Sequence, residues 1–133
     1  MPSVLLPDSE LIARNYLAAS TSVSALVSTR VSTELPDVPV FPCITLWRVG
    51  GIPDKVWGDH PRLQVEAWGR TKTEASQVAR TAFAALLDIG QTHSQGVVTD
   101  CAPANGPIWA PDPSYTPAKP RFVFDVILTT HSL

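Results

Sequence analysis

The side chains of this sequence that could do chemistry are three histidines, two cysteines and two carboxylates. His60 directly follows Asp59 in a loop rich in Gly and Pro, and neither His93 nor His131 lies four positions from another histidine or a carboxylate. A zinc site needs three or four ligands at short spacings, and two histidines bind one metal from a helix when they lie at i and i+4. No histidine here has that spacing, so the sequence predicts surface histidines and no metal site.

The two cysteines, Cys43 and Cys101, could supply a nucleophile or a disulfide. A cysteine nucleophile needs a histidine base and a group that orients it. Cys43 falls inside an apolar strand, and Asp100 beside Cys101 would repel a thiolate. Two cysteines are too few for a disulfide framework. We expect two buried free thiols, although the pair could form a bridge if the fold brought them together.

Glu66 and Asp125 could face each other on the polar side of a sheet and so imitate a catalytic carboxylate pair. A solvated or interfacial pair is favoured over a catalytic one. The sequence contains no nucleophile-elbow motif, no P-loop and no dinucleotide-binding glycine motif. It therefore predicts a protein without catalytic residues or cofactors, which is not an enzyme.

Composition favours one ordinary globular domain over residues 1–133. The apolar fraction is 44%, the charged fraction 17% and the net charge −2. This balance offers no basic footprint for nucleic acid and no polybasic patch for a membrane. No apolar run approaches the ~18 residues of a membrane span, and the first ten residues lack the features of a signal peptide. Nine of the 13 prolines lie in the segments 36–42 and 103–120, which indicates connections there.

The stretch 62–89, RLQVEAWGRTKTEASQVARTAFAALLDI, predicts a strand coupled closely to a long helix. Up to Trp68 the apolar residues alternate, with Leu63, Val65 and Ala67 on one face. Thr71 then begins a helix, where Thr71 and Glu74 form a T-x-x-E capping box. One apolar stripe continues the helix through Ala75, Val78, Ala79, Ala82, Leu86 and Ile89, and Gly90 is expected to cap its C-terminal end.

The remaining elements complete the expected fold. Residues 7–20 predict a first helix capped by Asp8, and residues 23–27 predict a further short turn. Strands are expected at 29–35, 41–49, 96–102 and 121–130, with an irregular segment over 103–120. This order predicts an α+β fold, in which a mainly antiparallel sheet of four to five strands is packed on one face by an N-terminal helix and one long central helix.

The second face of the expected sheet is only half polar. In the last strand the residues that can face the helices are Phe122, Phe124, Val126 and Leu128. The opposite row contains Val123, Asp125, Ile127 and Thr129, and Trp47 and Trp68 are expected to join it from other strands. Because a solvated sheet face normally reads polar, we expect another surface to cover this one.

Two long loops carry aromatic residues. The connection GGIPDKVWGDHP, residues 50–61, is longer than a hairpin requires and holds Trp57; the segment 103–120 holds Ile108, Trp109 and Tyr115. Exposed Trp and Tyr side chains often anchor protein interfaces, although each could also fold back onto its own domain. The predicted interface residues are Trp47, Trp57, Trp68, Trp109 and Tyr115.

The arrangement resembles the tail terminator, or tail completion, family of long-tailed bacteriophages. The resemblance spans nearly the whole chain, and its most specific part is VEAWGRTKTEASQVA, where a strand ends in an aromatic residue and a T-x-x-E-A helix begins. It implies a structural protein of the virion without catalytic residues. Such proteins form hexameric rings that cap the tail tube, end its polymerisation and join it to the head-tail connector.

The same resemblance implies where the protein is found. Its expected partners are further copies of itself, the tail tube protein and a connector or adaptor protein. DNA would pass through the ring without tight binding, and the ring would sit at the neck end of the tail after assembly in the host cytoplasm. Two alternatives remain: another neck ring, such as a head-closure or adaptor protein, or a small ligand-binding or enzymatic α+β domain. Adaptors tend to be mostly helical, whereas this chain is rich in strands.

Overall fold

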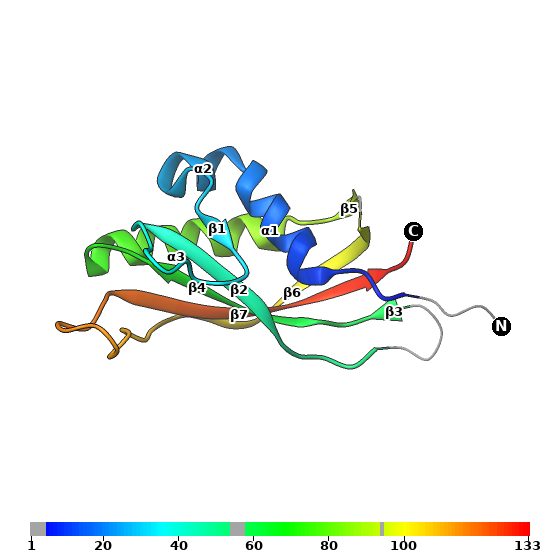
Figure 1. The fold of residues 1–133 in the computed structure, drawn as a ribbon. Helices are drawn as coiled ribbons and strands as arrows, with labels where there is room; N and C mark the ends of the chain where they lie inside the picture. The colour runs from blue at the N-terminus through cyan, green and yellow to red at the C-terminus, as the bar shows by residue number, and fades with distance from the viewer. Residues whose placement is uncertain (1–4, 54–57, 94) are drawn as a thin grey trace.

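The computed structural model describes residues 5–53, 58–93 and 95–133, and its three helices pack against one face of a single curved sheet (Figure 1). The elements in chain order are α1 (Ser9–Ala19), α2 (Thr21–Val27), β1 (Val31–Ser32), β2 (Cys43–Gly50), β3 (Gly58–Asp59), β4 (Arg62–Trp68), α3 (Lys72–Leu87), β5 (Gln91–His93), β6 (Gly96–Trp109) and β7 (Arg121–His131).

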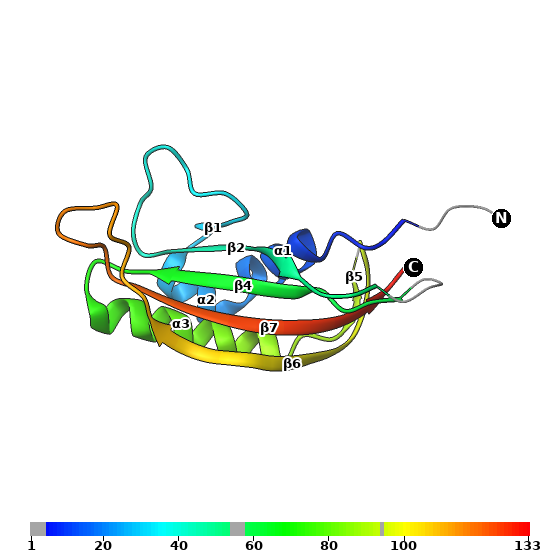
Figure 2. The same ribbon diagram turned by 90° about the horizontal axis from the view of Figure 1, so that it is seen from below.

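The sheet has the strand order β1-β2-β4-β7-β6-β5, and β3 pairs with the end of β7. Among the described strands only β1 runs parallel to its neighbour; the other pairs, including β3 with β7, are antiparallel. Four strands are long, and three have only two or three residues. The predicted α+β class, with a mainly antiparallel sheet covered on one face by helices, is confirmed. Figure 2 shows that β1 and β6 lie toward opposite edges of this sheet.

The core lies between the helices and the inner face of the sheet. The predicted stripe of α3, from Ala75 to Ile89, is buried along its whole length. The predicted inner row of β4 is fully buried, and in β7 Phe124, Val126 and Leu128 are as well. Phe83 and Phe122 are half-buried against this cluster, and the ring of Phe83 meets that of Phe124 edge-on at 5.2 Å.

Leu86 provides a direct test of this register because its side chain is fully buried at the centre of the core. Replacing Leu86 with Ala should lower the free energy of unfolding by about 2 to 5 kcal/mol, since the lost methyl groups leave a cavity. Chemical denaturation followed by circular dichroism measures this change. An unchanged unfolding midpoint would show that α3 packs in another register.

Both predicted N-terminal caps are present. The Asp8 carboxylate accepts the backbone N–H of Leu11 at 3.1 Å, and Thr71 Oγ1 accepts that of Glu74 at 3.1 Å. The second half of the capping box differs from the expectation, because the Glu74 carboxylate reaches the backbone N–H of Arg70, at 2.9 Å, and the Arg70 guanidinium. The shift by one residue lets Glu74 combine a cap with an ion pair.

The Arg70 contacts lower the pKa of Glu74 from 4.5 to about 2. A carboxyl whose pKa is depressed by folding adds stability above its unfolded pKa and loses it as pH falls toward the folded value. We therefore expect Glu74→Gln to flatten the pH dependence of stability between about pH 5 and pH 2. At neutral pH the cost should stay below about 1 kcal/mol, because the pair is largely solvated. Urea titrations of both proteins at several pH values test this.

Three predicted boundaries are wrong for physical reasons. Gly90 does not cap α3 with a left-handed residue; the helix ends at Leu87, and Asp88 closes it in a right-handed conformation. The strand expected at 29–35 is limited to Val31–Ser32. The Ser32 hydroxyl donates to the carbonyl of Glu34 at 2.7 Å, which turns the chain into the irregular segment 33–42.

The third wrong boundary concerns the proline-rich segment. The sequence predicts an irregular chain from Pro103, yet β6 continues along β7 to Trp109. Irregularities in the register around Asn105 accommodate the prolines, as bulges commonly do at sheet edges. The short strands β3 and β5 were not predicted.

Candidate interaction surfaces

The outer face of the sheet carries a buried polar network beside Trp68. The Glu66 carboxylate lies 2.8 Å from Nη1 of Arg121 and accepts the Thr45 hydroxyl at 3.0 Å. The indole N–H of Trp68 donates to the same hydroxyl at 3.2 Å. Burial raises the pKa of Glu66, while Arg121 and Thr45 oppose that rise. Each polar group therefore has a partner, and the network fixes Trp68 on this face.

A second ion pair lies further along the same face. Arg62 and Asp125 come from β4 and β7 and approach to 2.9 Å. Asp125 lies opposite Gln64 in the register, and Glu66 lies opposite Val123. Glu66 and Asp125, which the sequence allowed to face each other, therefore do not: each carboxylate binds its own arginine instead. Each of these two carboxylates is neutralised by an arginine, which is typical of a structural surface. A catalytic carboxylate pair would instead share a proton.

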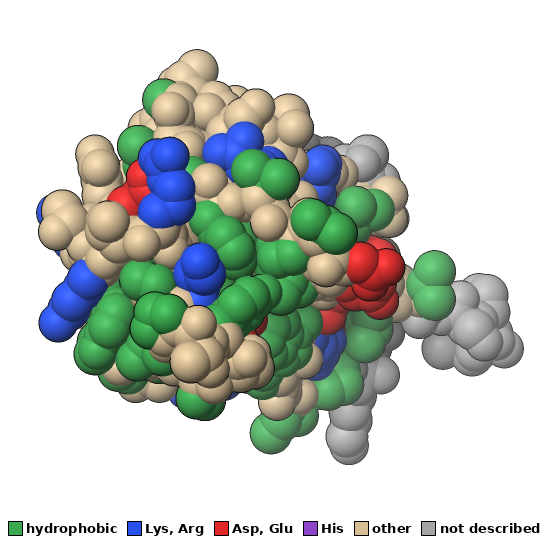
Figure 3. Space-filling view, turned by 60° about the vertical axis from the view of Figure 1, so that its left-hand side comes forward, with side chains coloured by type: hydrophobic (Ala, Val, Ile, Leu, Met, Phe, Trp, Pro, Cys, Tyr) green, Lys and Arg blue, Asp and Glu red, His purple; other side chains and the backbone are tan. Residues whose placement is uncertain are grey.

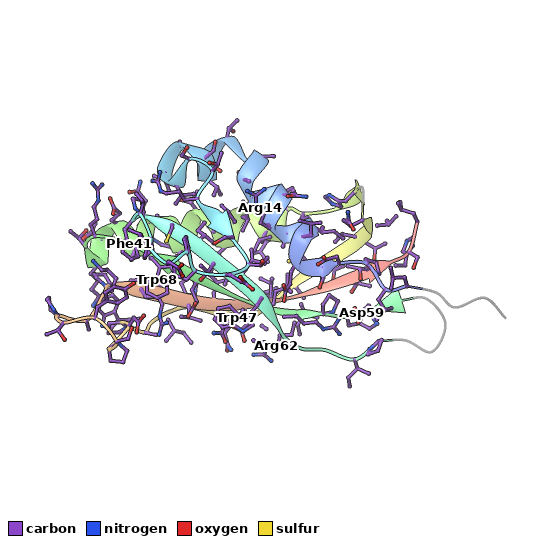
Figure 4. All side chains as sticks on the ribbon, viewed as in Figure 1. Arg14, Phe41, Trp47, Asp59, Arg62 and Trp68 are labelled. Carbon is purple, nitrogen blue, oxygen red and sulfur yellow. The ribbon has the colours of Figure 1, made fainter. Side chains whose placement is uncertain are left out.

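The predicted interface residues Trp47 and Trp68 both lie on this outer face (Figure 4). The Trp47 side chain is half-buried, so part of it can contact another molecule. Trp68 is only 3% exposed, because Phe41 and Tyr115 of the same chain pack against it at 6.0 and 6.4 Å between ring centroids. Trp68 is therefore a packing residue beneath Phe41 and Tyr115 and is not itself available to a partner. Trp57 lies outside the described residues.

Phe41, Trp68 and Tyr115 form a cluster that joins segment 33–42 to the loop 110–120. Phe41 and Tyr115 meet edge-on at 6.1 Å, and the Lys119 ammonium sits over the Phe41 ring at 4.6 Å. The Arg121 guanidinium sits over Trp68 at 5.1 Å. Figure 3 turns this end of the molecule forward and shows hydrophobic side chains gathered there with basic ones among them.

The far end of β6 exposes apolar side chains at the edge of the sheet. Ile108 is 54% exposed and Trp109 is 39% exposed. Trp109 also packs on Phe122 at 5.3 Å and lies 4.7 Å from the Lys72 ammonium. In the described chain β6 pairs with β5 only through residue 98, so its outer side from Thr99 to Trp109 has no strand beside it. This open edge, residues 99–109, offers Ile108 and Trp109 to a partner.

The opposite edge of the sheet contains a pocket of about 350 Å³ under segment 33–42. Arg14 and Arg30 line it from one side, and Val38 and Val40 line it from the loop. Val38 is 84% exposed and Val40 is 59% exposed, although both are apolar. Figure 2 shows the loop standing away from the sheet. We call this pocket the arginine slot. Each chain thus presents two different edges, one recessed and basic and one extended and apolar.

A comparison with protein families gives this architecture a context. The sequence profile described as "Tail completion protein gp17" matches residues 12–106, which is more than half of the chain. The chain belongs to this tail completion family. It is therefore a structural protein of a phage-type tail, and the resemblance noted from the sequence is confirmed. Proteins of this kind are virion components and not enzymes.

A solved structure shares the fold. A chain from a structure titled "Virion of native gene transfer agent (GTA) particle" superposes with a TM-score of 0.72 at 16% identity, covering 92% of this chain and 94% of that one. No curated protein matches. None of the helices in the described part of the chain has the length and apolar character needed to cross a membrane.

In the described chain the histidines of this tail completion protein contact backbone carbonyls and a hydroxyl. His93 contacts the carbonyl of Gly90 at 3.2 Å, and His60 lies 3.5 Å from the Thr129 hydroxyl. Asp59, next to His60 in sequence, points to Arg48 instead and is fully buried. Within residues 5–53, 58–93 and 95–133 no three potential ligands form a metal-binding group.

The cysteines are two buried free thiols, as the favoured interpretation predicted. Cys43 pairs with Trp68 on the outer face of the sheet, and Cys101 pairs with Leu128 on the inner face. Burial raises the pKa of Cys43 to about 11 and that of Cys101 to about 12, and Asp100 adds to the second shift. Both thiols are therefore protonated and unreactive at neutral pH.

Several residues of these surfaces were missed from the sequence. Phe41 joins the aromatic cluster, and Arg14 and Arg30 form the slot, but all three come from segments without a motif. The extension of β6 to Trp109 has only a weak signal in the sequence, the β-prone pair Ile108 and Trp109, and the flanking prolines argue against a strand there. The slot had no comparable signal, because its arginines are 16 positions apart and meet only through the fold.

Proposed function

We propose that six copies of this chain form a ring that caps the tail tube, ends its polymerisation and joins it to the head-tail connector. The ring would sit at the neck end of the tail and assemble in the host cytoplasm. Membership of the tail completion family supports this proposal. Further support comes from the side chains exposed on the two edges of the sheet.

The observation that carries the proposal is the difference between the two edges of the sheet. A closed ring needs two different surfaces on each copy, since every contact in it is head-to-tail. The open edge of β6 exposes Ile108 and Trp109, and the other edge carries Val38 and Val40 around the arginine slot. Each of the two opposite edges therefore exposes apolar side chains, although Trp109 also packs on Phe122, and a head-to-tail contact requires two such different surfaces.

The outer face of the sheet offers a third surface for the tube or the connector. Trp47 is half-buried there, and Val123 and Ile127 are half-buried on the same face. The two ion pairs around them, Arg62–Asp125 and Glu66–Arg121, add no net charge to the face. We place the contact with the tail tube or the connector on this face, together with the aromatic end that contains Tyr115.

The genome would pass through such a ring without binding tightly. Each Lys or Arg paired with a phosphate adds affinity and would slow sliding. A chain of net charge −2 can line the channel with at least as many carboxylates as basic side chains.

The test is to add the purified protein to tail tube protein during polymerisation and to measure tube lengths by electron microscopy. The proposal expects shorter tubes with a ring at one end. Tubes of unchanged length without a terminal ring would overturn it.

A further inference from the structure

The arginine slot has the chemistry of a site for a carboxylate. Nε of Arg14 donates to the carbonyl of Val31 at 2.9 Å, and Nε of Arg30 donates to that of Pro42 at 2.8 Å. These bonds hold both guanidiniums at the wall. Nη1 of Arg14 also donates to Asn15 Oδ1 at 3.1 Å, and the remaining terminal N–H groups are left for a ligand. None of the described residues that line the slot is acidic. Two fixed guanidiniums with no carboxylate among the residues that line the slot favour an incoming one.

The apolar rim indicates that the ligand is a polypeptide. Pro36, Val38 and Val40 line the slot beside the arginines. A free inorganic anion would gain nothing from these side chains, whereas a strand that carries a carboxylate among small apolar residues would bury both kinds of group. The slot therefore fits an extended acidic and apolar segment.

The chain itself contains one such segment. Most carboxylates in the described residues are engaged, either with arginines or with backbone or hydroxyl donors: Asp8, Glu10, Asp59, Glu66, Glu74, Asp112 and Asp125. Glu34 and Asp37 belong to segment 33–42, which forms the slot. Asp88 follows the end of α3 and is not in a strand. Asp100 is exposed and lies in the open edge of β6, next to Cys101, Ala102 and Pro103.

Asp100 cannot reach the slot of its own chain, because β6 and β1 lie toward opposite edges of the sheet (Figure 2). We propose that the arginine slot of one copy receives the open edge of β6 from the next copy, with the Asp100 carboxylate paired to Arg14 and Arg30. This inference rests on the proposed ring and specifies its repeating contact. Pro103 and Pro107 lack N–H groups, so this edge docks through side chains and does not extend the neighbouring sheet as a regular strand.

A disulfide cross-link tests the contact directly. Val40→Cys and Asp100→Cys each place a thiol on an exposed position, one at the slot and one on β6. The native thiols should not interfere, because Cys43 is 5% exposed and Cys101 is 9% exposed, and both have raised pKa values. Under mild oxidation, in solution and on purified tails, the double variant should give a ladder of covalent multimers that ends at the closed ring. Each single variant should give no ladder.

The outcomes separate the contact from the ring. If the double variant gives no ladder although native mass measurement shows a ring, the proposed contact is wrong and the ring remains. If wild-type protein forms no ring either in solution or on tails, both proposals fall.

A charge exchange tests the role of Asp100. Asp100→Lys should weaken association of the copies about tenfold or more, as the loss of a close interfacial charge pair does. Adding Val40→Asp to the Asp100→Lys variant should restore much of that loss, since a carboxylate then stands in the slot to meet the new lysine. Asp88→Lys, which makes the same change of charge outside β6, should leave association unchanged. Equal effects of Asp100→Lys and Asp88→Lys would overturn the assignment.

Discussion

Asp59→Asn should lower the free energy of unfolding by about 3 kcal/mol, which is the largest effect that we expect from a single polar substitution. The Asp59 side chain is fully buried and binds Arg48 through both carboxylate oxygens, at 2.5 and 2.9 Å. Its Oδ1 also accepts the backbone N–H of His60 at 2.9 Å. Breaking a buried ion pair by removing one partner typically costs about 3 to 5 kcal/mol. Arg48 is 28% exposed, so water can solvate it partly, and we expect the lower end of that range.

The position of the Arg48–Asp59 ion pair explains why its loss should destabilise the whole fold. Arg48 lies in β2, and its Nε also donates to the carbonyl of Gly50 at 2.9 Å. Gly51 follows with φ 104°, and a Cβ there would lie 2.1 Å from the carbonyl oxygen of His60. The ion pair thus holds the chain where it leaves β2 and where it returns to the sheet. Urea denaturation measures the change, with Glu74→Gln as a control for an exposed ion pair; a cost below 1 kcal/mol would contradict this role.

Ile108→Asp should abolish the ring while leaving the fold intact. The side chain is 54% exposed in the single chain, so a carboxylate can be solvated there before assembly. In an assembled ring the same carboxylate would be buried against a neighbour, eight residues along β6 from Asp100 and so away from the slot arginines, which costs several kcal/mol per contact. Because every copy makes this contact, the same free-energy cost arises at each interface of the proposed ring.

The measurement for Ile108→Asp is native mass spectrometry together with circular dichroism and electron microscopy of tails. Leu133→Asp is the matched control, because Leu133 is 74% exposed and follows the last strand. We expect a folded monomer for Ile108→Asp and normal rings for the control. A folded Ile108→Asp protein that still forms rings and joins tails to heads would place the contact elsewhere.

The sequence predicted the inner side of this molecule well. Periodicity of two in β4 and of about 3.6 in α3 placed the buried residues, because both patterns are set by the same core. The caps at Asp8 and Thr71 were also visible, since they depend on residues only three positions apart. The caps, and the periodicity of the buried face of each element, depend on residues close together in the sequence, so short sequence patterns predict them.

The outer surfaces could be predicted only in part. Trp47 and Trp109 were selected because tryptophan often anchors interfaces, but the sequence could not show that Trp68 is covered by Phe41 and Tyr115 of its own chain. The ion pairs join β4 to β7 across 55 and 63 positions, and their register follows from strand order, which alternation alone does not determine. The continuation of β6 past Pro103 depended on bulges that no short motif announces.

The mass of the protein on the tail tube tests the central proposal most directly. Tubes capped in the presence of the purified protein can be isolated, cross-linked and measured by mass photometry after release of the terminal assembly, with the protein alone as the reference. We predict one assembly of six copies at a single end of each tube. A terminal assembly of any other number of copies would contradict the six-membered ring, and protein distributed along the tube or absent from its ends would contradict the capping function itself.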